Sequence, residues 1–473
     1  MKQILDKAIV PISLLLANIA NFIIQIVIPR NLSPVEYSQF TLAWSAGLFI
    51  SALFFEWIRV FIIRYGQEGN KDFIISYRCT IIKLYKIIST FLLTSFVVIL
   101  IFFYKYSVVW ISSALFFAVF KGLFDGIQAS DRANFRNQLF AQRWLLSSVL
   151  GLVLCLSVSY YTGTGYLSLI SLSFSFPLAI VILNLDYLKQ ALLKQSVDEK
   201  IAKCIWNYGL FLSISTLIMS LFPFLLRFML VDRVSGDGVA GLLLALEISG
   251  KTVLACGMFL NILLLQYVIK KVDSNKENMG VFMSLQVTFT AAVILPSSIL
   301  FFAILQYFSN SIAPMNYLKG YLQYLDITLI FSLLMTLKLY AVDSLFAISG
   351  KTRYALIGSF SMILSIILVY IFSYSQLFPN IDYISLIIIL PALLGLVISI
   401  LCVAIFTPIQ WDFKNIIIIL LASIIMFVFF KVIFKNEGLL NLGLSIFISC
   451  IVYIFFILIF NIKLISKIKS LKG

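Results

Sequence analysis

The sequence predicts an all-α, polytopic integral membrane protein, and three observations support this fold class. Of its 473 residues, 62% are hydrophobic and 12% are charged, whereas soluble globular proteins are about 25% charged. Long apolar runs recur along the chain at about the length that crosses a bilayer as a helix. Basic residues concentrate in alternate connections between these runs, which is typical of a chain that crosses the membrane repeatedly.

About 14 transmembrane helices are predicted, within a range of 12–14 because the last two runs lie close together. The first seven runs are near 7–28, 40–63, 81–104, 107–128, 139–160, 166–186 and 205–230. The other seven are near 240–267, 281–305, 326–349, 354–376, 383–406, 415–434 and 439–462. No connection is long enough for a separate soluble domain, so we expect the protein to act within the membrane.

The basic residues predict the orientation of these helices. With the N-terminus in the cytoplasm, 25 of the 35 lysines and arginines fall on cytoplasmic ends and loops, seven fall outside and three lie within spans. This bias follows the positive-inside rule and predicts that both termini are cytoplasmic. The net charge of +15 therefore reflects topology and suits anionic lipid headgroups; it gives no reason to expect a nucleic acid partner.

The residue types available argue against an enzyme or a metalloprotein. The chain has no histidine, and its six cysteines are scattered without a CxxC pair. The commonest general base and the usual zinc ligand are therefore missing, and the cysteines are interpreted as small core residues. We expect no cofactor and no metal site.

The polar stretch "PRNLSPVEYSQF" (29–40) is predicted to form the first outer turn. Ser33 can cap the second span, and Pro34 suits the first helical position. Glu36 would complete a capping box by bonding back to the Ser33 amide.

The same stretch resembles the entry to span two in the polysaccharide transporters of the MOP exporter superfamily, which include O-antigen and capsule repeat-unit flippases. Leu32, Pro34, Tyr37 and Phe40 match the family pattern, whereas serines at 33 and 38 replace its two glycines. The segments "FDGIQASDRANFR" (124–136), "DRVSGDGVAGLLLA" (232–245) and "FAISGKTRYAL" (346–356) support the resemblance. It covers about residues 1–406 and implies a multi-pass protein of the bacterial inner membrane.

The order of these motifs also suggests an internal repeat. Two pseudo-symmetric six-helix lobes, an N-terminal lobe (1–190) and a C-terminal lobe (204–406), would surround a central cavity. Residues 407–473 would form an accessory helix pair with a basic cytoplasmic tail.

Ionisable side chains within the spans are the candidate site residues, because such residues are costly in lipid and usually face a bundle interior or a water-filled cavity. Glu247 and Lys251 lie four residues apart on one helix face. Lys338 has no partner at α-helical spacing. The complete candidate set for the cavity is Lys251, Lys338, Arg59, Glu247, Asp343, Glu56, Lys121, Asp125, Asn18, Asn21 and Gln25.

Structural alternatives exist for several candidates. Glu247 and Lys251 would tolerate burial as a self-neutralising pair within one helix. The pairs Glu56–Arg59 and Lys121–Asp125 lie close enough to the cytoplasmic surface to snorkel. The three amide side chains of the first span are more often explained by hydrogen bonds between helices than by substrate contact.

The resemblance implies a flippase for a polyprenyl (undecaprenyl)-pyrophosphate-linked oligosaccharide that works by alternating access. Lys251, Lys338 and Arg59 would contact the diphosphate, and Glu247 and Asp343 would orient the lysines or carry a coupling Na+ or H+, although coupling itself is not predicted. Partners would be membrane lipids and the polysaccharide polymerase machinery. Two alternatives are a cation-coupled multidrug exporter of the same superfamily and a membrane repeat-unit polymerase; the latter lacks a charged outer loop.

Overall fold

The computed structural model of the protein describes residues 2–65, 71–103, 109–134, 136–183, 199–233, 237–274, 276–374, 383–433 and 439–460. Within these ranges every regular element is a helix, which confirms the all-α class. The elements of the first half are α1 (Lys2–Asn31), α2 (Pro34–Tyr65), α3 (Lys71–Phe103), α4 (Val109–Ala133), α5 (Asn137–Thr162), α6 (Gly165–Leu183) and α8 (Glu199–Arg233). Next come α9 (Asp237–Ser274), η1 (Lys276–Asn278), α10 (Met279–Tyr307), α11 (Ser309–Ile312), α12 (Met315–Thr336), η2 (Leu337–Val342) and α13 (Asp343–Ile348). The last are η3 (Thr352–Tyr354), α14 (Ala355–Tyr374), α15 (Tyr383–Phe406), α16 (Phe413–Ile433) and α17 (Leu439–Phe460).

The predicted membrane spans correspond closely to these helices. Thirteen helices in the described part of the chain are long and apolar enough to cross a membrane. The run predicted near 81–104 is observed as Cys79–Phe102, and the run near 166–186 as Gly165–Leu183. The run near 205–230 lies within α8. The prediction of a polytopic protein with about 14 spans is confirmed.

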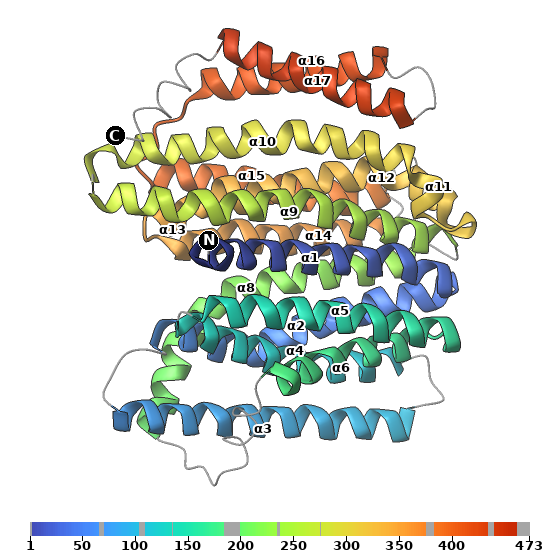
Figure 1. Ribbon diagram of the computed structural model, residues 1–473, viewed down its shortest axis with the longest axis vertical. Helices are drawn as coiled ribbons and strands as arrows, with labels where there is room; N and C mark the ends of the chain where they lie inside the picture. The colour runs from blue at the N-terminus through green and yellow to red at the C-terminus, as the bar shows by residue number, and fades with distance from the viewer. Residues whose placement is uncertain are drawn as a thin grey trace. The chain divides into compact units, whose positions relative to one another are not determined.

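The chain forms two compact units, Met1–Leu243 and Leu244–Gly473, and the division falls within α9. In the first unit, α2 packs against α4 and α8, α5 packs against α1 and α6, and α3 lies alongside α4 (Figure 1). In the second unit, α15 packs against α12 and α14, and α16 packs against α10 and α17. The sequence-based lobe boundaries and the internal repeat remain predictions.

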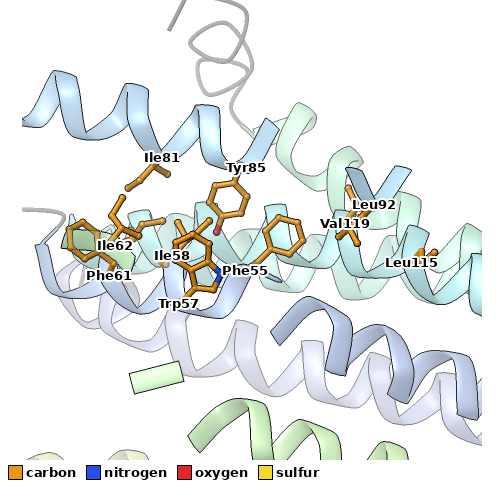
Figure 2. Close-up of a cluster of buried hydrophobic side chains, with 12 residues drawn as sticks. Phe55, Trp57, Ile58, Phe61, Ile62, Ile81, Tyr85, Leu92, Leu115 and Val119 are labelled. Carbon is orange, nitrogen blue, oxygen red and sulfur yellow. The ribbon is translucent and has the colours of Figure 1, made fainter. Parts of the chain in front are cut away.

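The core of the first unit brings α2, α3 and α4 close together. Phe55 of α2 and Tyr85 of α3 stack with ring centroids 5.3 Å apart, within a larger cluster of buried apolar side chains (Figure 2). Two glycines of α4 permit this approach, since a Cβ at Gly122 would collide with the Phe55 ring and one at Gly126 with the Tyr85 hydroxyl. Such small residues allow membrane helices to approach closely.

The first turn of the chain confirms one half of the predicted capping box and corrects the other. Ser33 Oγ accepts a hydrogen bond from the Glu36 amide at 3.3 Å, so the serine caps α2. The Glu36 carboxylate instead accepts a hydrogen bond from the Gly165 amide at 2.6 Å. Glu36 therefore caps α6 and joins its start to the start of α2, because the amides at a helix N-terminus favour an anionic acceptor.

In the second unit, the helix pair α16–α17 is attached to α10 at a proline. Pro296 lies within α10 and has no amide hydrogen to donate to the carbonyl of Ala292, four residues earlier. The Tyr453 hydroxyl of α17 donates to that carbonyl at 2.5 Å. An interhelical hydrogen bond thus satisfies a backbone acceptor that the proline leaves open.

Candidate functional site

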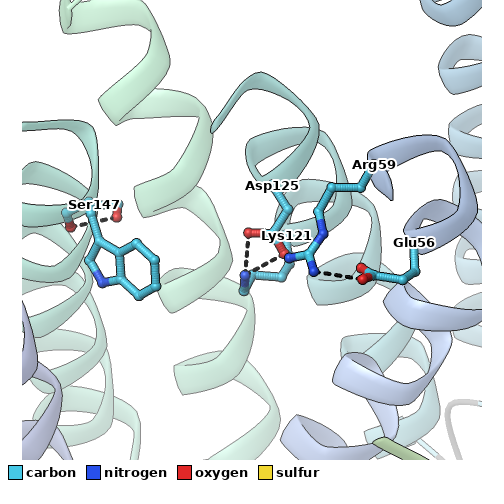
Figure 3. Close-up of polar contacts among 6 residues, drawn as sticks. Glu56, Arg59, Lys121, Asp125 and Ser147 are labelled. Atoms are coloured by element: carbon cyan, nitrogen blue, oxygen red, sulfur yellow. Dashed lines mark hydrogen bonds and ion pairs between the residues drawn. The ribbon is translucent and has the colours of Figure 1, made fainter. Parts of the chain in front are cut away.

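A network of four charged side chains joins α2 to α4. Arg59 donates to Glu56 at 2.6 Å, and the Lys121 ammonium lies 2.5 Å from both carboxylate oxygens of Asp125. Glu56 also interacts electrostatically with Lys121 and Asp125, and the Arg59 side chain reaches from α2 towards Asp125 (Figure 3). The two predicted pairs therefore form one site.

The network is balanced in charge and is only partly shielded. The Arg59 side chain is 36% exposed and the Lys121 side chain 25% exposed, whereas the Glu56 side chain is 8% exposed. Lys121 also lies over the ring of Phe176 from α6, 5.9 Å from its centroid. The two cations are thus more accessible than the Glu56 carboxylate.

The amide side chains of α1 have different surroundings. Asn21 donates to the Ser148 hydroxyl of α5 at 3.1 Å, which is the interhelical alternative considered for this residue. Gln25 is buried at 2% exposure, and Asn18 is exposed. Asn18 is therefore the one of these three side chains that is exposed.

Lys338 is completely buried and lies 2.5 Å from Asp343. Its ammonium also donates to the Ser359 hydroxyl of α14 at 3.1 Å. At the spacing of an α-helix, Lys338 was predicted to have no charged partner. Residues 337–342 instead form a π-helix, which accommodates an additional residue in the turn. The turn brings together two predicted site residues that are five positions apart.

Glu247 and Lys251 lie on α9 and are both half-buried. Ser249, between them, is within hydrogen-bond distance of the Thr328 hydroxyl of α12, at 3.1 Å. Residues two positions away on an α-helix point to roughly the opposite side, so the contact with α12 directs Glu247 and Lys251 away from that helix. The spacing predicted a shared face for this pair, and the packing of α9 agrees with it.

Comparison with known proteins gives no sequence-level match: no protein-family model and no curated protein matches the chain. Among solved structures, it is similar to the lipid II flippase MurJ in an inward closed conformation, with a TM-score of 0.69. The two chains are 13% identical, and the match covers 96% of this chain and 99% of MurJ.

Multidrug transporters of the MATE family are also similar. An inward-facing MATE transporter of the MOP superfamily matches with a TM-score of 0.51 and 16% identity, over 82% of this chain and 92% of its own. The MATE transporter DinF-BH matches with a TM-score of 0.53 and 15% identity, over 86% of this chain and 94% of its own. The protein shares the fold of these solved transporter structures.

The structure also contains a buried ion pair that was not predicted from the sequence. Arg143 of α5 binds the carboxylate of Asp131 of α4, and neither side chain has any exposure. Arg143 was counted among the basic residues of the cytoplasmic ends and loops, although its position inside the run predicted near 139–160 was a signal for burial. The pair joins the end of α4 to the beginning of α5.

Within the described ranges, the acidic and cysteine side chains form no cluster that could hold a metal ion. In the described ranges, no group of three or more histidine, cysteine, aspartate or glutamate side chains comes together. The site chemistry of the described residues therefore consists of ammonium and guanidinium groups, carboxylates, amides and hydroxyls.

Proposed function

We propose that the protein is a flippase for a polyprenyl (undecaprenyl)-pyrophosphate-linked oligosaccharide. It would move single repeat units from the cytoplasmic to the outer leaflet of the bacterial inner membrane, by alternating access, for O-antigen or capsular polysaccharide synthesis. The observation that carries this proposal is the nearly complete structural match to a lipid II flippase, at a TM-score of 0.69. The MATE transporters match a smaller share of the chain at lower TM-scores.

The charged residues fit such a substrate. A diphosphate needs cationic partners, sugars need polar and aromatic surfaces, and the lipid tail can remain in the bilayer. Arg59, which is the more exposed member of its ion pair, and Lys251, which α9 directs away from α12, are the two cations proposed to contact the diphosphate. Carboxylates beside them would balance their charge until the substrate enters.

Lys338 has a different part in this proposal. Its ammonium is fully buried and already bonded to Asp343 and Ser359, so direct contact with the diphosphate would require both bonds to break. We therefore propose that Lys338 and Asp343 position their helix, while Glu247 keeps its proposed role of orienting Lys251.

A cation-coupled multidrug exporter is the second candidate, because MATE transporters share the fold. A cationic drug would need an acidic site, whereas the network on α2 and α4 contains equal numbers of cations and carboxylates. A membrane repeat-unit polymerase is the third candidate, and it would need a general acid or base near the outer surface. The lack of histidine in the sequence counts against it.

The fate of lipid-linked oligosaccharide in native cells that lack the protein tests the proposal. A flippase predicts single repeat units trapped on the cytoplasmic leaflet, inaccessible to a periplasmic glycosidase. Unpolymerised units in the outer leaflet would instead identify a polymerase. Normal glycan in the deletion strain would refute both and favour the exporter.

The Lys251→Ala variant tests the proposed contact directly. We expect it to lose at least tenfold in flipping rate at equal membrane abundance, because one charge-assisted contact to phosphate contributes about 1.5–3 kcal/mol. Lys319→Ala is the matched control, since Lys319 is an exposed lysine near the start of α12. Equal rates in the two variants would remove Lys251 from the site.

A further inference from the structure

The span Met315–Ile348 changes helix type in its last third. Residues 315–336 are α-helical, residues 337–342 form a π-helix, and residues 343–348 return to an α-helix. A π-turn holds one residue more than an α-turn; such turns are rare and frequently lie at functional sites. This turn therefore separates two α-helical segments whose registers differ by one residue.

The Lys338–Asp343 pair depends on this change of register. In a continuous α-helix, residues five positions apart point about 140° away from each other. In the π-turn, the Lys338 ammonium lies 2.5 Å from Asp343 and 3.1 Å from Ser359 of α14. A buried lysine without a carboxylate partner is strongly destabilising, so the ion pair holds the turn in its π form.

The turn contacts several other helices, α9, α10, α14 and α15. Gly257 of α9 lies so close that a Cβ there would collide with Thr336 and Tyr340. Helices α10 and α15 also pack against η2, and Ser359 connects it to α14. A change of register here would therefore alter the packing contacts with several neighbouring helices.

We propose that η2 is a two-state register switch, in which the buried Lys338–Asp343 pair holds the π state. Closing the turn to an α-turn would rotate α13 by about 100° and shift it by about 1.5 Å. It would also separate Lys338 from Asp343 and displace residues 349–353, which lead into α14. The role of this switch in transport rests on the proposed function. The existence of its two registers does not depend on that function.

The register is measured by cysteine labelling in a variant that lacks the six native cysteines. In the π state Ala347 is exposed and Phe346 is buried, so a cysteine at 347 should react with N-ethylmaleimide and one at 346 should be protected. After closure to an α-turn, each position would take the direction of the residue that follows it. Position 346 would then react, and position 347 would take the buried direction of Ile348.

Two double variants distinguish the effect of losing the ion pair from a general loss of folding. Lys338→Met with Asp343→Leu removes both charges together and leaves no unpaired buried ion; we expect its labelling to move from 347 to 346, with at least a tenfold change in the ratio of rates. Lys338→Asp with Asp343→Lys keeps an ion pair in reverse order and should retain the native labelling pattern. Flipping of lipid-linked oligosaccharide in reconstituted vesicles should fall at least tenfold in the first variant and persist in the second.

The possible outcomes distinguish the switch from the function. An unchanged labelling pattern in the variant without charges would overturn the switch, whatever the substrate is. A moved pattern with native flipping rates would overturn its role in transport. If the native protein flips no lipid-linked oligosaccharide, the proposed function fails, and the labelling pattern alone then decides whether the switch exists.

Discussion

Replacing Tyr453 with phenylalanine tests how the C-terminal helix pair is held. The substitution removes only the hydroxyl that donates to the Ala292 carbonyl and keeps the aromatic ring of a buried residue at 8% exposure. The carbonyl then has neither the tyrosine nor an amide hydrogen from Pro296 as a donor.

The expected loss of stability follows from the absence of any other donor to the Ala292 carbonyl. Neutral hydrogen bonds between membrane helices contribute about 0.6 kcal/mol on average, because the separated helices find other partners. A buried acceptor left without any partner costs more, about 1–3 kcal/mol, and Pro296 removes the partner within the helix. We therefore expect Tyr453→Phe to lower the free energy of unfolding by about 1–2 kcal/mol.

A double-mutant cycle with Pro296→Ala isolates the effect. Alanine at 296 restores the amide that bonds to the Ala292 carbonyl, so Tyr453→Phe should cost less than about 0.5 kcal/mol in that background. Reversible unfolding in mixed micelles measures all four variants, and Pro391→Ala, in another helix of the same unit, is the control proline. An equal cost of Tyr453→Phe with and without Pro296 would refute the reasoning.

Three further predictions concern packing. Arg143→Met leaves the Asp131 carboxylate charged in a fully buried site and should lower stability by about 3–5 kcal/mol; a loss below 1 kcal/mol in a detergent unfolding series would contradict this. Glu36→Ala removes the acceptor for the Gly165 amide and should cost about 1–2 kcal/mol, with faster hydrogen exchange at that amide; native exchange protection there would count against the cap. Gly358→Leu should cost about 1–3 kcal/mol, because a Cβ there would already meet Ser399 of α15; an unaltered melting temperature would mean that α14 and α15 are not closely packed.

The fold class and the spans were predictable because lipid imposes one dominant requirement. Every membrane-spanning segment must satisfy its backbone internally and present apolar side chains, and this requirement leaves a signal in every run of the sequence. The Ser33 cap was predictable for a similar reason, since a cap acts within a few residues of its own position.

Contacts between distant segments were not predictable in this way. The sequence placed Glu36 in a capping box, whereas the tertiary fold brings the start of α6 within its reach. The partner of Lys338 was not predicted, because residues 337–342 form a π-turn and α-helical spacing does not bring position 343 beside Lys338. Arg143 and Asp131 are twelve positions apart, on either side of the turn between α4 and α5, and only the packing of these helices reveals that they meet.

The attachments of α5 have a mechanical consequence. Ser159, near its C-terminus, accepts a hydrogen bond from Asn31 at 3.0 Å, Ser148 accepts one from Asn21, and Arg143, near its N-terminus, binds Asp131. The first and last of these attachments are sixteen residues apart, about 24 Å along the helix axis, which is most of the thickness of the hydrocarbon layer. A displacement of one end of α5 would therefore be transmitted along the helix to its other end, together with the parts of α1 and α4 that are bonded to it.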